Sequence, residues 1–353
     1  MGVVAESTNE VERVPSERRR WRKSWLAVLA ALLALVAAES LYRFARVGAS
    51  GWGGARFVWA EDARVGAARA FYLARDFSVP DGAALSDARI LVLGDEQYQV
   101  HLNGVWVGSG SYQPGEPADH YDVSGLLRPG PNRLVIEARS ATGVGGVLAA
   151  LYLQGEDRPL VASDESWRVL GHHVDGIVPG TYRIDEGAAV AVLGRPPLGR
   201  WRSPRPGSLR PAAPLEVREV WAASLEKVPA PRGRRTHALW KVDFGTEVEG
   251  YLELWSDLGS CGCPLRFFVT EEELVDYYAA PSAGATAKTE HASRPLVLVP
   301  GAPRWRDVSP RRFRYVTLEA PDPPRAARVL LAAAPPWVAP RGPFGLAPPP
   351  SDS

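Results

Sequence analysis

The sequence predicts an all-β protein, with two tandem antiparallel β-sandwiches behind one N-terminal transmembrane helix. Three observations lead to this fold class. Short segments such as residues 97–102 alternate between apolar and polar side chains, which is the period of a half-buried strand. Tight turns such as Asn103-Gly104 separate these segments. The 353 residues also include 34 glycines and 32 prolines, which suits a turn-rich β protein.

The charge balance excludes one broad class of function. The chain has 41 Lys and Arg residues against 40 Asp and Glu residues, so its formal charge is close to zero. A protein dedicated to nucleic-acid binding would carry a clear basic excess. The sequence also lacks the GxSxG, HExxH, P-loop and Rossmann glycine patterns, so no common catalytic motif directs the interpretation.

The N-terminal region predicts a membrane segment. Residues 1–23 form a polar tail that ends in a basic block, and residues 24–42 are almost purely apolar. A helix of about 20 apolar residues spans a bilayer, and preceding basic residues place the N-terminus in the cytoplasm. We therefore expect a single-pass anchor with the rest of the chain periplasmic or extracellular. The alternative is a signal peptide cleaved near residues 36–38, which would make the protein secreted.

Residues 57–202 are expected to form the first sandwich, after a Gly-rich spacer over residues 43–56. Its strongest signal is the hairpin around Asn103-Gly104. In the strand before this turn, one face carries the apolar side chains and the other carries the polar ones. The apolar set is Tyr98, Val100 and Leu102, and the polar set is Gln97, Gln99 and His101.

Residues 215–334 are expected to form the second sandwich. A Pro-rich linker over residues 203–214 precedes it, and a disordered Pro-rich tail over residues 335–353 follows it. The strand signals are the runs 237–244 and 249–257, both rich in aromatic and branched side chains.

Two sets of motifs resemble bacterial α-L-rhamnosidases. In the first, Asn103-Gly104 is followed by Asp122-Val123-Ser124-x-Leu126-Leu127-x-Pro129-Gly130-x-Asn132 and an apolar strand. This pattern is similar to the N-terminal sugar-binding jelly roll of that family, and galactose-binding-like domains of β-galactosidases and β-glucuronidases share much of it. In the second set, Asp243-Phe244-Gly245 and the later Phe313-Arg314-Tyr315-Val316 resemble the family's concanavalin-like sandwich.

The resemblance implies a galactose-binding-like jelly roll followed by a concanavalin-like sandwich, the non-catalytic N-terminal region of these enzymes. The family's catalytic residues lie in an (α/α)6 barrel that has no counterpart here, so they are carried over to no position. The expected function is carbohydrate binding or scaffolding at the cell envelope, not catalysis. One alternative is a protein-interaction platform that docks a separate enzyme or envelope protein. Another is a residual glycoside hydrolase, which would need two facing carboxylates.

A loop region at the rim of the first sandwich supplies the candidate binding residues. They are Asp95, Glu96, Tyr112, Asp119, His120 and Tyr121. Aromatic rings stack on the C–H faces of sugars, while polar groups bind the hydroxyls. The expected ligand is a rhamnose-containing or other envelope glycan. In related sugar-binding modules an acidic loop helps to hold Ca²⁺, which makes Asp95 a calcium candidate. The alternative is an ordered loop whose aromatic rings pack on the sheet.

Two further features belong to the second sandwich. Tyr251 and Trp255 share one strand face with Glu253, and this aromatic face suits binding of a glycan or a protein. Packing between the two sandwiches explains the same pattern. Cys261 and Cys263 are either a strained local disulfide or two small side chains at a turn, and two cysteines are too few for a structural zinc site.

Overall fold

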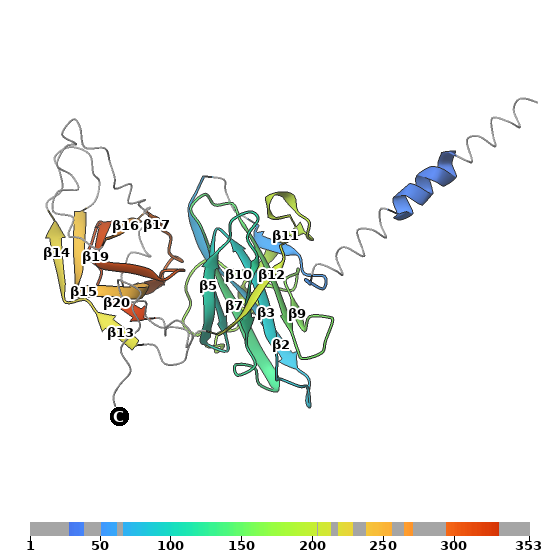
Figure 1. Ribbon diagram of the computed structural model, residues 1–353, viewed down its shortest axis with the longest axis horizontal. Helices are drawn as coiled ribbons and strands as arrows, with labels where there is room; N and C mark the ends of the chain where they lie inside the picture. Colours follow the sequence, from blue (N-terminus) through green and yellow to red (C-terminus); the bar gives the residue numbers. More distant parts are fainter. Residues whose placement is uncertain are drawn as a thin grey trace, which may run out of the picture. The chain divides into compact units, whose positions relative to one another are not determined.

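The computed structural model describes residues 28–38, 51–61, 66–202, 204–212, 218–228, 238–255, 265–270 and 294–331. The chain divides into two compact units, Met1–Ala49 and Ser50–Ser353. The described residues of the second unit form β-strands, which Figure 1 shows, and two single 3₁₀ turns, η1 (Ile184–Glu186) and η2 (Gly199–Trp201). The predicted all-β class is confirmed for this unit.

The N-terminal unit corrects one prediction. Its described residues form a helix over residues 28–38. Within the part of the chain that the structure describes, no helix has the length and apolar character needed to cross a membrane. The predicted single-pass localisation, with residues 24–42 as the anchor, is therefore wrong.

The first sheet contains twelve strands. They are β1 (Phe57–Ala60), β2 (Arg69–Val79), β3 (Arg89–Asp95), β4 (Gln97–Leu102), β5 (Val105–Ser111), β6 (Ala118–Asp122), β7 (Gly130–Ser140), β8 (Gly146–Tyr152), β9 (Val161–Ala162), β10 (Arg168–Leu170), β11 (Ala188–Gly194) and β12 (Pro206–Pro211). The neighbour order is β12-β6-β3-β8-β1-β11-β10-β2-β7-β4-β5, with β9 on β8.

Strand β11 makes this sheet curl into two layers. Its first residues pair with β10, and its later residues pair with β1. Strands β10, β2, β7, β4 and β5 then continue one layer, while β1, β8, β3 and β6 continue the other. Side chains from both layers share one buried core, which includes Phe71 and Leu73 from one layer and Ile90 and Val92 from the other. Two layers around one apolar core are the architecture of a β-sandwich.

The predicted hairpin and its alternation are confirmed. Strands β4 and β5 pair around Asn103 and Gly104, both of which have positive φ angles of 52° and 87°. The apolar set on β4 lies in the shared core, so Gln99 and His101 point away from it. Strand β12 lies within residues 203–214, the predicted linker, and pairs in parallel with β6.

The second sheet contains eight strands. They are β13 (Arg218–Trp221), β14 (Ser224–Val228), β15 (Ala238–Trp255), β16 (Leu265–Thr270), β17 (Arg294–Leu296), β18 (Arg304–Arg306), β19 (Arg311–Ala320) and β20 (Ala326–Leu331). The 18-residue strand β15 organises this sheet, because it pairs with β14, β18, β19 and β20.

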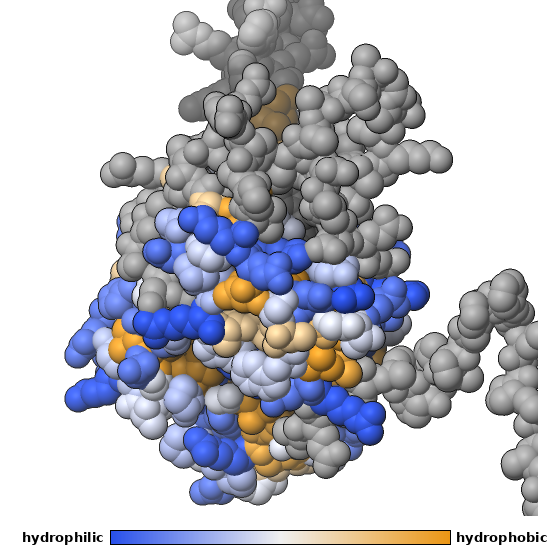
Figure 2. Space-filling model, turned by 90° about the vertical axis from the view of Figure 1, so that its left-hand side faces the viewer, coloured by the Kyte–Doolittle hydropathy of each residue, from blue (hydrophilic) through white to orange (hydrophobic). Residues whose placement is uncertain are grey.

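Strand β15 changes partners along its length. Its first half pairs with β14 and β19, the register shifts between Asp243 and Val248, and its second half pairs with β20 and β18. Its inward side chains, among them Val242, Leu252 and Leu254, form a separate buried core. The surface in Figure 2 carries small apolar patches between hydrophilic residues, as expected of a half-buried sheet.

Candidate functional site

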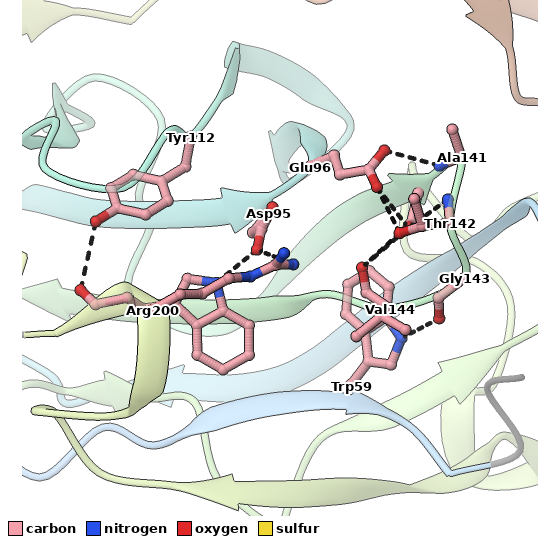
Figure 3. Close-up of polar contacts among 11 residues, drawn as sticks. Trp59, Asp95, Glu96, Tyr112, Ala141, Thr142, Gly143, Val144 and Arg200 are labelled. Atoms are coloured by element: carbon pink, nitrogen blue, oxygen red, sulfur yellow. Dashed lines mark hydrogen bonds and ion pairs between the residues drawn. The ribbon is translucent and has the colours of Figure 1, made fainter. Parts of the chain in front are cut away.

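The predicted calcium candidate Asp95 ends strand β3, and its carboxylate is bound inside the protein (Figure 3). Its Oδ2 accepts a 2.6 Å hydrogen bond from Trp201 Nε1 and lies 2.5 Å from an Arg200 guanidinium nitrogen. Burial raises the pKa of Asp95, and these two partners act in the opposite direction. The aromatic and basic residues of η2 therefore cover this carboxylate.

The neighbouring Glu96 holds the loop that follows β7. Its carboxylate accepts hydrogen bonds from the Ala141 backbone N–H at 2.8 Å and from the Thr142 hydroxyl at 2.7 Å. The Ser140 hydroxyl donates a third at 3.2 Å. Figure 3 shows Glu96 directed at this loop and Asp95 directed at Arg200. The two predicted acidic residues thus serve different loops.

The remaining rim residues also have partners within the chain. The Tyr112 hydroxyl donates to the Trp201 carbonyl at 3.3 Å, and the Tyr121 hydroxyl donates to the Ser109 carbonyl at 3.1 Å. The Asp119 carboxylate accepts from the Tyr98 hydroxyl and from the Arg210 guanidinium.

His120 has one ring nitrogen in contact with a backbone oxygen and one without a partner. Its Nδ1 lies 3.3 Å from the Gly207 carbonyl, while its buried Nε2 has no hydrogen-bond partner among the described residues. Burial lowers the pKa of this ring. The six rim residues thus fall into separate contact groups, and His120 contributes the one buried polar atom of this set that is recorded without a partner.

The described residues contain no group of three or more His, Cys, Asp or Glu side chains that could hold a metal ion. Cys261 and Cys263 lie outside the described residues. The calcium and disulfide predictions therefore stay predictions.

A pocket of about 490 Å³ lies between outward side chains of the first sheet and strand ends of the second. We call it the junction pocket. Its lining residues are Tyr72, Gln99, His101, Gly104, Trp106, Glu137, Arg139, His173, Val178, Pro179, Trp255, Ala302, Pro303, Arg304 and Arg306.

The alternation of the first sheet builds one wall of this pocket. Tyr72, Gln99, His101, Glu137 and Arg139 lie on β2, β4 and β7, on the face opposite to the shared core. The second sheet covers this polar face. Gln99 Nε2 and Arg139 Nη1 both donate to the Arg306 carbonyl, at 2.8 and 2.7 Å.

Aromatic rings form another part of the wall. The ring of Trp106 meets Tyr251 edge-on at 5.0 Å between centroids, and the Arg306 guanidinium lies 4.3 Å from the Trp106 centroid. Trp255 lines the pocket and stacks on Trp221 at 5.4 Å. Tyr251 thus takes part in packing between the two sheets, which the sequence left open as an alternative, while Trp255 lies at the pocket.

A buried carboxylate organises the charges behind the pocket. Glu253 accepts hydrogen bonds from Arg306 Nε at 2.6 Å and from Arg328 Nε at 2.7 Å. Burial alone would raise the pKa of Glu253, but the nearby guanidinium groups of Arg306, Arg304 and Arg328 hold it below its usual value. This carboxylate is therefore ionised and fixes the arginines that face the pocket.

Burial and three nearby arginines together set the charge state of His101. Burial, followed by the positive charges of Arg306, Arg304 and Arg139, lowers the pKa of His101 to about 3. The imidazole is therefore neutral near pH 7, with one nitrogen able to donate and the other able to accept a hydrogen bond.

Three buried polar atoms of the pocket lining have no hydrogen-bond partner among the described residues. They are His101 Nδ1, Trp106 Nε1 and Arg306 Nη1. Buried polar groups are nearly always satisfied by protein, water or ligand, because leaving one unpaired costs free energy. Three such atoms at one pocket mark a place where water or a polar ligand can bind.

Sequence reasoning placed Trp255 on an exposed aromatic face and proposed no binding role for His101, Trp106, Arg304 or Arg306, which line the pocket with it. The alternation of β4 correctly placed Gln99 and His101 on a polar face. No local pattern indicated that the second sheet covers that face, because Gln99 and Arg306 are 207 residues apart.

Comparisons with known proteins agree with the predicted resemblance. No protein-family model matches the sequence. A curated β-galactosidase from Arthrobacter sp. (strain B7) is 28% identical over 176 residues, which cover 44% of this chain and 16% of that protein. The chain therefore spans a small part of the length of this curated relative.

Solved structures similar to this chain include α-L-rhamnosidases, as the sequence motifs predicted. The enzyme from Dictyoglomus thermophilum has a TM-score of 0.49 at 14% identity, over 79% of this chain and 35% of that one. The enzyme from Aspergillus terreus has a TM-score of 0.48 at 18% identity, over 80% and 36%. A Pleurotus ostreatus lectin in complex with GalNAc has a TM-score of 0.38 at 15% identity, over 78% and 77%.

Proposed function

We propose that this chain binds carbohydrate and that the junction pocket holds a sugar residue. The observation that carries the proposal is the set of three buried, unpartnered polar atoms on His101, Trp106 and Arg306. Sugar hydroxyls both donate and accept hydrogen bonds. They can accept from Trp106 Nε1 and Arg306 Nη1 and can bond to the neutral imidazole of His101. The rings of Trp106 and Trp255 supply the apolar surface on which sugar C–H faces stack.

The sequence supports the same function. The motifs of residues 89–139 resemble the sugar-binding jelly roll of α-L-rhamnosidases, and the curated relative is named a β-galactosidase. In this proposal the first sheet is a galactose-binding-like jelly roll and the second is a concanavalin-like sandwich. The pocket lies where the two meet.

Isothermal titration calorimetry with the full chain tests the proposal. The ligands are L-rhamnose, D-galactose, D-glucose and their oligosaccharides, each with calcium and with a chelator. We expect heat of binding for at least one sugar and its loss in Trp255→Ala. If no sugar binds under either condition, the proposal fails.

A rim variant separates the two candidate places. Glu96→Gln alters the hydrogen bonds that Glu96 accepts from the loop after β7, and Glu96 is not among the residues that line the junction pocket. We expect this variant to bind sugar as the unmodified chain does. Loss of binding in Glu96→Gln together with normal binding in Trp255→Ala would move the site to the predicted rim.

We propose a protein-interaction platform as the second candidate. Trp221 is 49% exposed and stacks on Trp255, so part of an aromatic pair faces solvent. A separate enzyme docked there would stay bound in excess sugar and would be released by Trp221→Ala. Release by sugar alone would instead favour the carbohydrate site.

A further inference from the structure

We propose that the junction pocket selects an acidic sugar, a pyranose whose carboxylate binds between Arg304 and Arg306. This inference rests on the proposed carbohydrate function and adds the chemical class of the ligand. It follows from the charges around the pocket, from one buried donor and from the size of the cavity.

The charges around the pocket leave an excess of positive charge. Among the lining residues, Arg139, Arg304 and Arg306 carry guanidinium groups and Glu137 carries a carboxylate. Glu253 lies behind them and pairs with Arg304, Arg306 and Arg328. Arg139 pairs with Glu137 at 2.6 Å, and Arg328 is shared by Glu219 and Glu253. Glu253 must therefore also serve Arg306 and Arg304.

Arg304 is the least engaged of these four. Its guanidinium lies 3.5 Å from Glu253, against 2.6 Å for Arg306 and 2.7 Å for Arg328. Its side chain is 42% exposed and lines the pocket, so it meets a ligand that enters from solvent.

Arg306 offers a donor that the protein does not use. Its residue is 9% exposed, its Nε binds Glu253, and its buried Nη1 has no hydrogen-bond partner among the described residues. A guanidinium binds a carboxylate through charge-assisted hydrogen bonds, which are shorter and stronger than neutral ones. A ligand carboxylate would accept a hydrogen bond from Arg306 Nη1 and would also balance positive charge on the guanidinium groups of Arg304 and Arg306.

The pKa of His101 is lowered by the same positive potential, in addition to burial. After burial, the groups that lower its pKa are the guanidiniums of Arg306, Arg304 and Arg139, which reach it from β18 and β7. An anion bound beside these arginines is favoured by the potential that disfavours the imidazolium.

The size and walls of the pocket favour a sugar acid over a small inorganic anion. A volume of about 490 Å³ exceeds the ~30 Å³ share of one water molecule many times over. Trp106, Trp255 and Tyr72 present aromatic surface that an inorganic anion would leave uncovered. A sugar acid suits both parts of the pocket, because its pyranose ring can stack on the aromatic side chains while its carboxylate binds the guanidinium groups.

The test compares matched ligands on the full chain by calorimetry. D-glucuronic and D-galacturonic acids are set against D-glucose and D-galactose, with D-glucose 6-phosphate as a second kind of anion. We expect the uronic acids to bind at least about tenfold more tightly than the neutral sugars. Their affinity should also fall as salt rises, because salt screens the ion pair.

Arg304→Gln is the decisive variant, since its partly exposed side chain can be replaced without opening the core. It should lose about tenfold in uronic-acid affinity and keep its affinity for neutral sugars. Arg183→Gln is the control, because that side chain is 85% exposed and lies outside the pocket lining. It should bind all ligands as the unmodified chain does.

The other outcomes distinguish the two proposals. Equal binding of acidic and neutral sugars would overturn the selection for acids and leave carbohydrate binding intact. If the sugar phosphate binds and the uronic acids do not, the proposal that the ligand carries a carboxylate is wrong and the pocket selects a phosphate instead. Absence of binding to every sugar would overturn both proposals.

Discussion

At Glu253, one carboxylate without solvent exposure holds three guanidinium groups at the back of the junction pocket. A buried ion pair gains little over well-packed apolar residues, but removing one partner leaves an uncompensated charge in the interior. Glu253 is therefore the residue on which the arrangement of Arg304, Arg306 and Arg328 depends.

We expect Glu253→Gln to lower the free energy of unfolding by about 3 to 5 kcal/mol at pH 7, because it leaves the buried guanidinium of Arg306 without its counter-charge. Chemical denaturation followed by tryptophan fluorescence measures it. The control is Glu247→Gln, which alters an exposed pair with Arg312 and should cost less than about 1 kcal/mol. Equal costs in both variants would contradict this role of Glu253.

The contribution of Glu253 to the free energy of unfolding should also depend on pH. Its pKa in the folded protein lies below the ordinary 4.5, so the folded state binds its proton less readily than the unfolded state does. The stability that this carboxylate contributes is therefore complete above pH 4.5 and declines as the pH falls below it. The difference between the unmodified chain and Glu253→Gln should narrow in that range, and a constant difference would contradict the prediction.

His101 predicts a second dependence on pH. Its pKa of about 3 lies below the ordinary 6.5, so the unfolded state takes up a proton that the folded state refuses. Stability should fall as the pH is lowered from 6.5 towards 3, and His101→Gln should reduce this fall. His172→Gln is the control, since that side chain is exposed, and its profile should follow the unmodified chain.

Among the elements, the turn between β7 and β8 shows how tightly the predicted rim is built. Gly145 leaves no room for a side chain, because an added Cβ would lie 2.0 Å from the Asp95 carbonyl oxygen and 2.6 Å from the Trp59 ring. This turn and Ser140 at the end of β7 also donate three hydrogen bonds to the Glu96 carboxylate. The rim is therefore a packed junction of loops.

We expect Gly145→Ala to destabilise the protein by about 1 to 3 kcal/mol, because the backbone of β3 or of the turn must shift. Thermal and urea unfolding measure the change. Gly125→Ala is the matched control, since a Cβ there meets nothing within 4 Å and the residue needs no positive φ. If Gly145→Ala lowers the free energy of unfolding as little as Gly125→Ala does, the turn can shift to accommodate the added methyl group and the prediction is wrong.

The sequence predicted several elements correctly for identifiable reasons. Alternation over residues 97–102 matched β4 because one face of that strand lies on the core, and Asn103-Gly104 matched the turn because both residues adopt positive φ. The apolar run over residues 24–42 misled the prediction of a membrane anchor, because no helix among the described residues is long and apolar enough to cross a membrane.

At the scale of the whole molecule, the junction pocket could not be predicted from local patterns. Its lining comes from β2, β4, β5 and β7 of the first sheet, from β15 and β18 of the second, and from connecting segments that carry residues such as His173 and Pro303. Contacts such as Arg139 to Arg306 join residues 167 positions apart. Periodicity gives the face on which a side chain lies, while the partner of that face depends on the packing of the complete chain.

The contact between Trp106 and Tyr251 offers a measure of how strongly the two sheets are coupled. A double-mutant cycle with Trp106→Ala and Tyr251→Ala should give a coupling energy of about 0.5 to 1.5 kcal/mol, the usual range for an edge-on aromatic pair. Additive single-mutant effects would show that the rings contribute independently. Trp240→Ala with Trp106→Ala is the control pair, because Trp240 contacts Ala320 within the second sheet and should show no coupling.

The pairing of β13 with β20 also has a consequence for synthesis on the ribosome. All twelve strands of the first sheet precede β13 in the chain, so that sheet can be completed first. Strand β13 must then wait for β20, and the Glu219–Arg328 pair between them spans 109 residues. At translation rates of about 5 to 20 residues per second, this delay is roughly 5 to 20 seconds. The second sheet therefore completes its β13–β20 pairing only after the first sheet has had this time to fold.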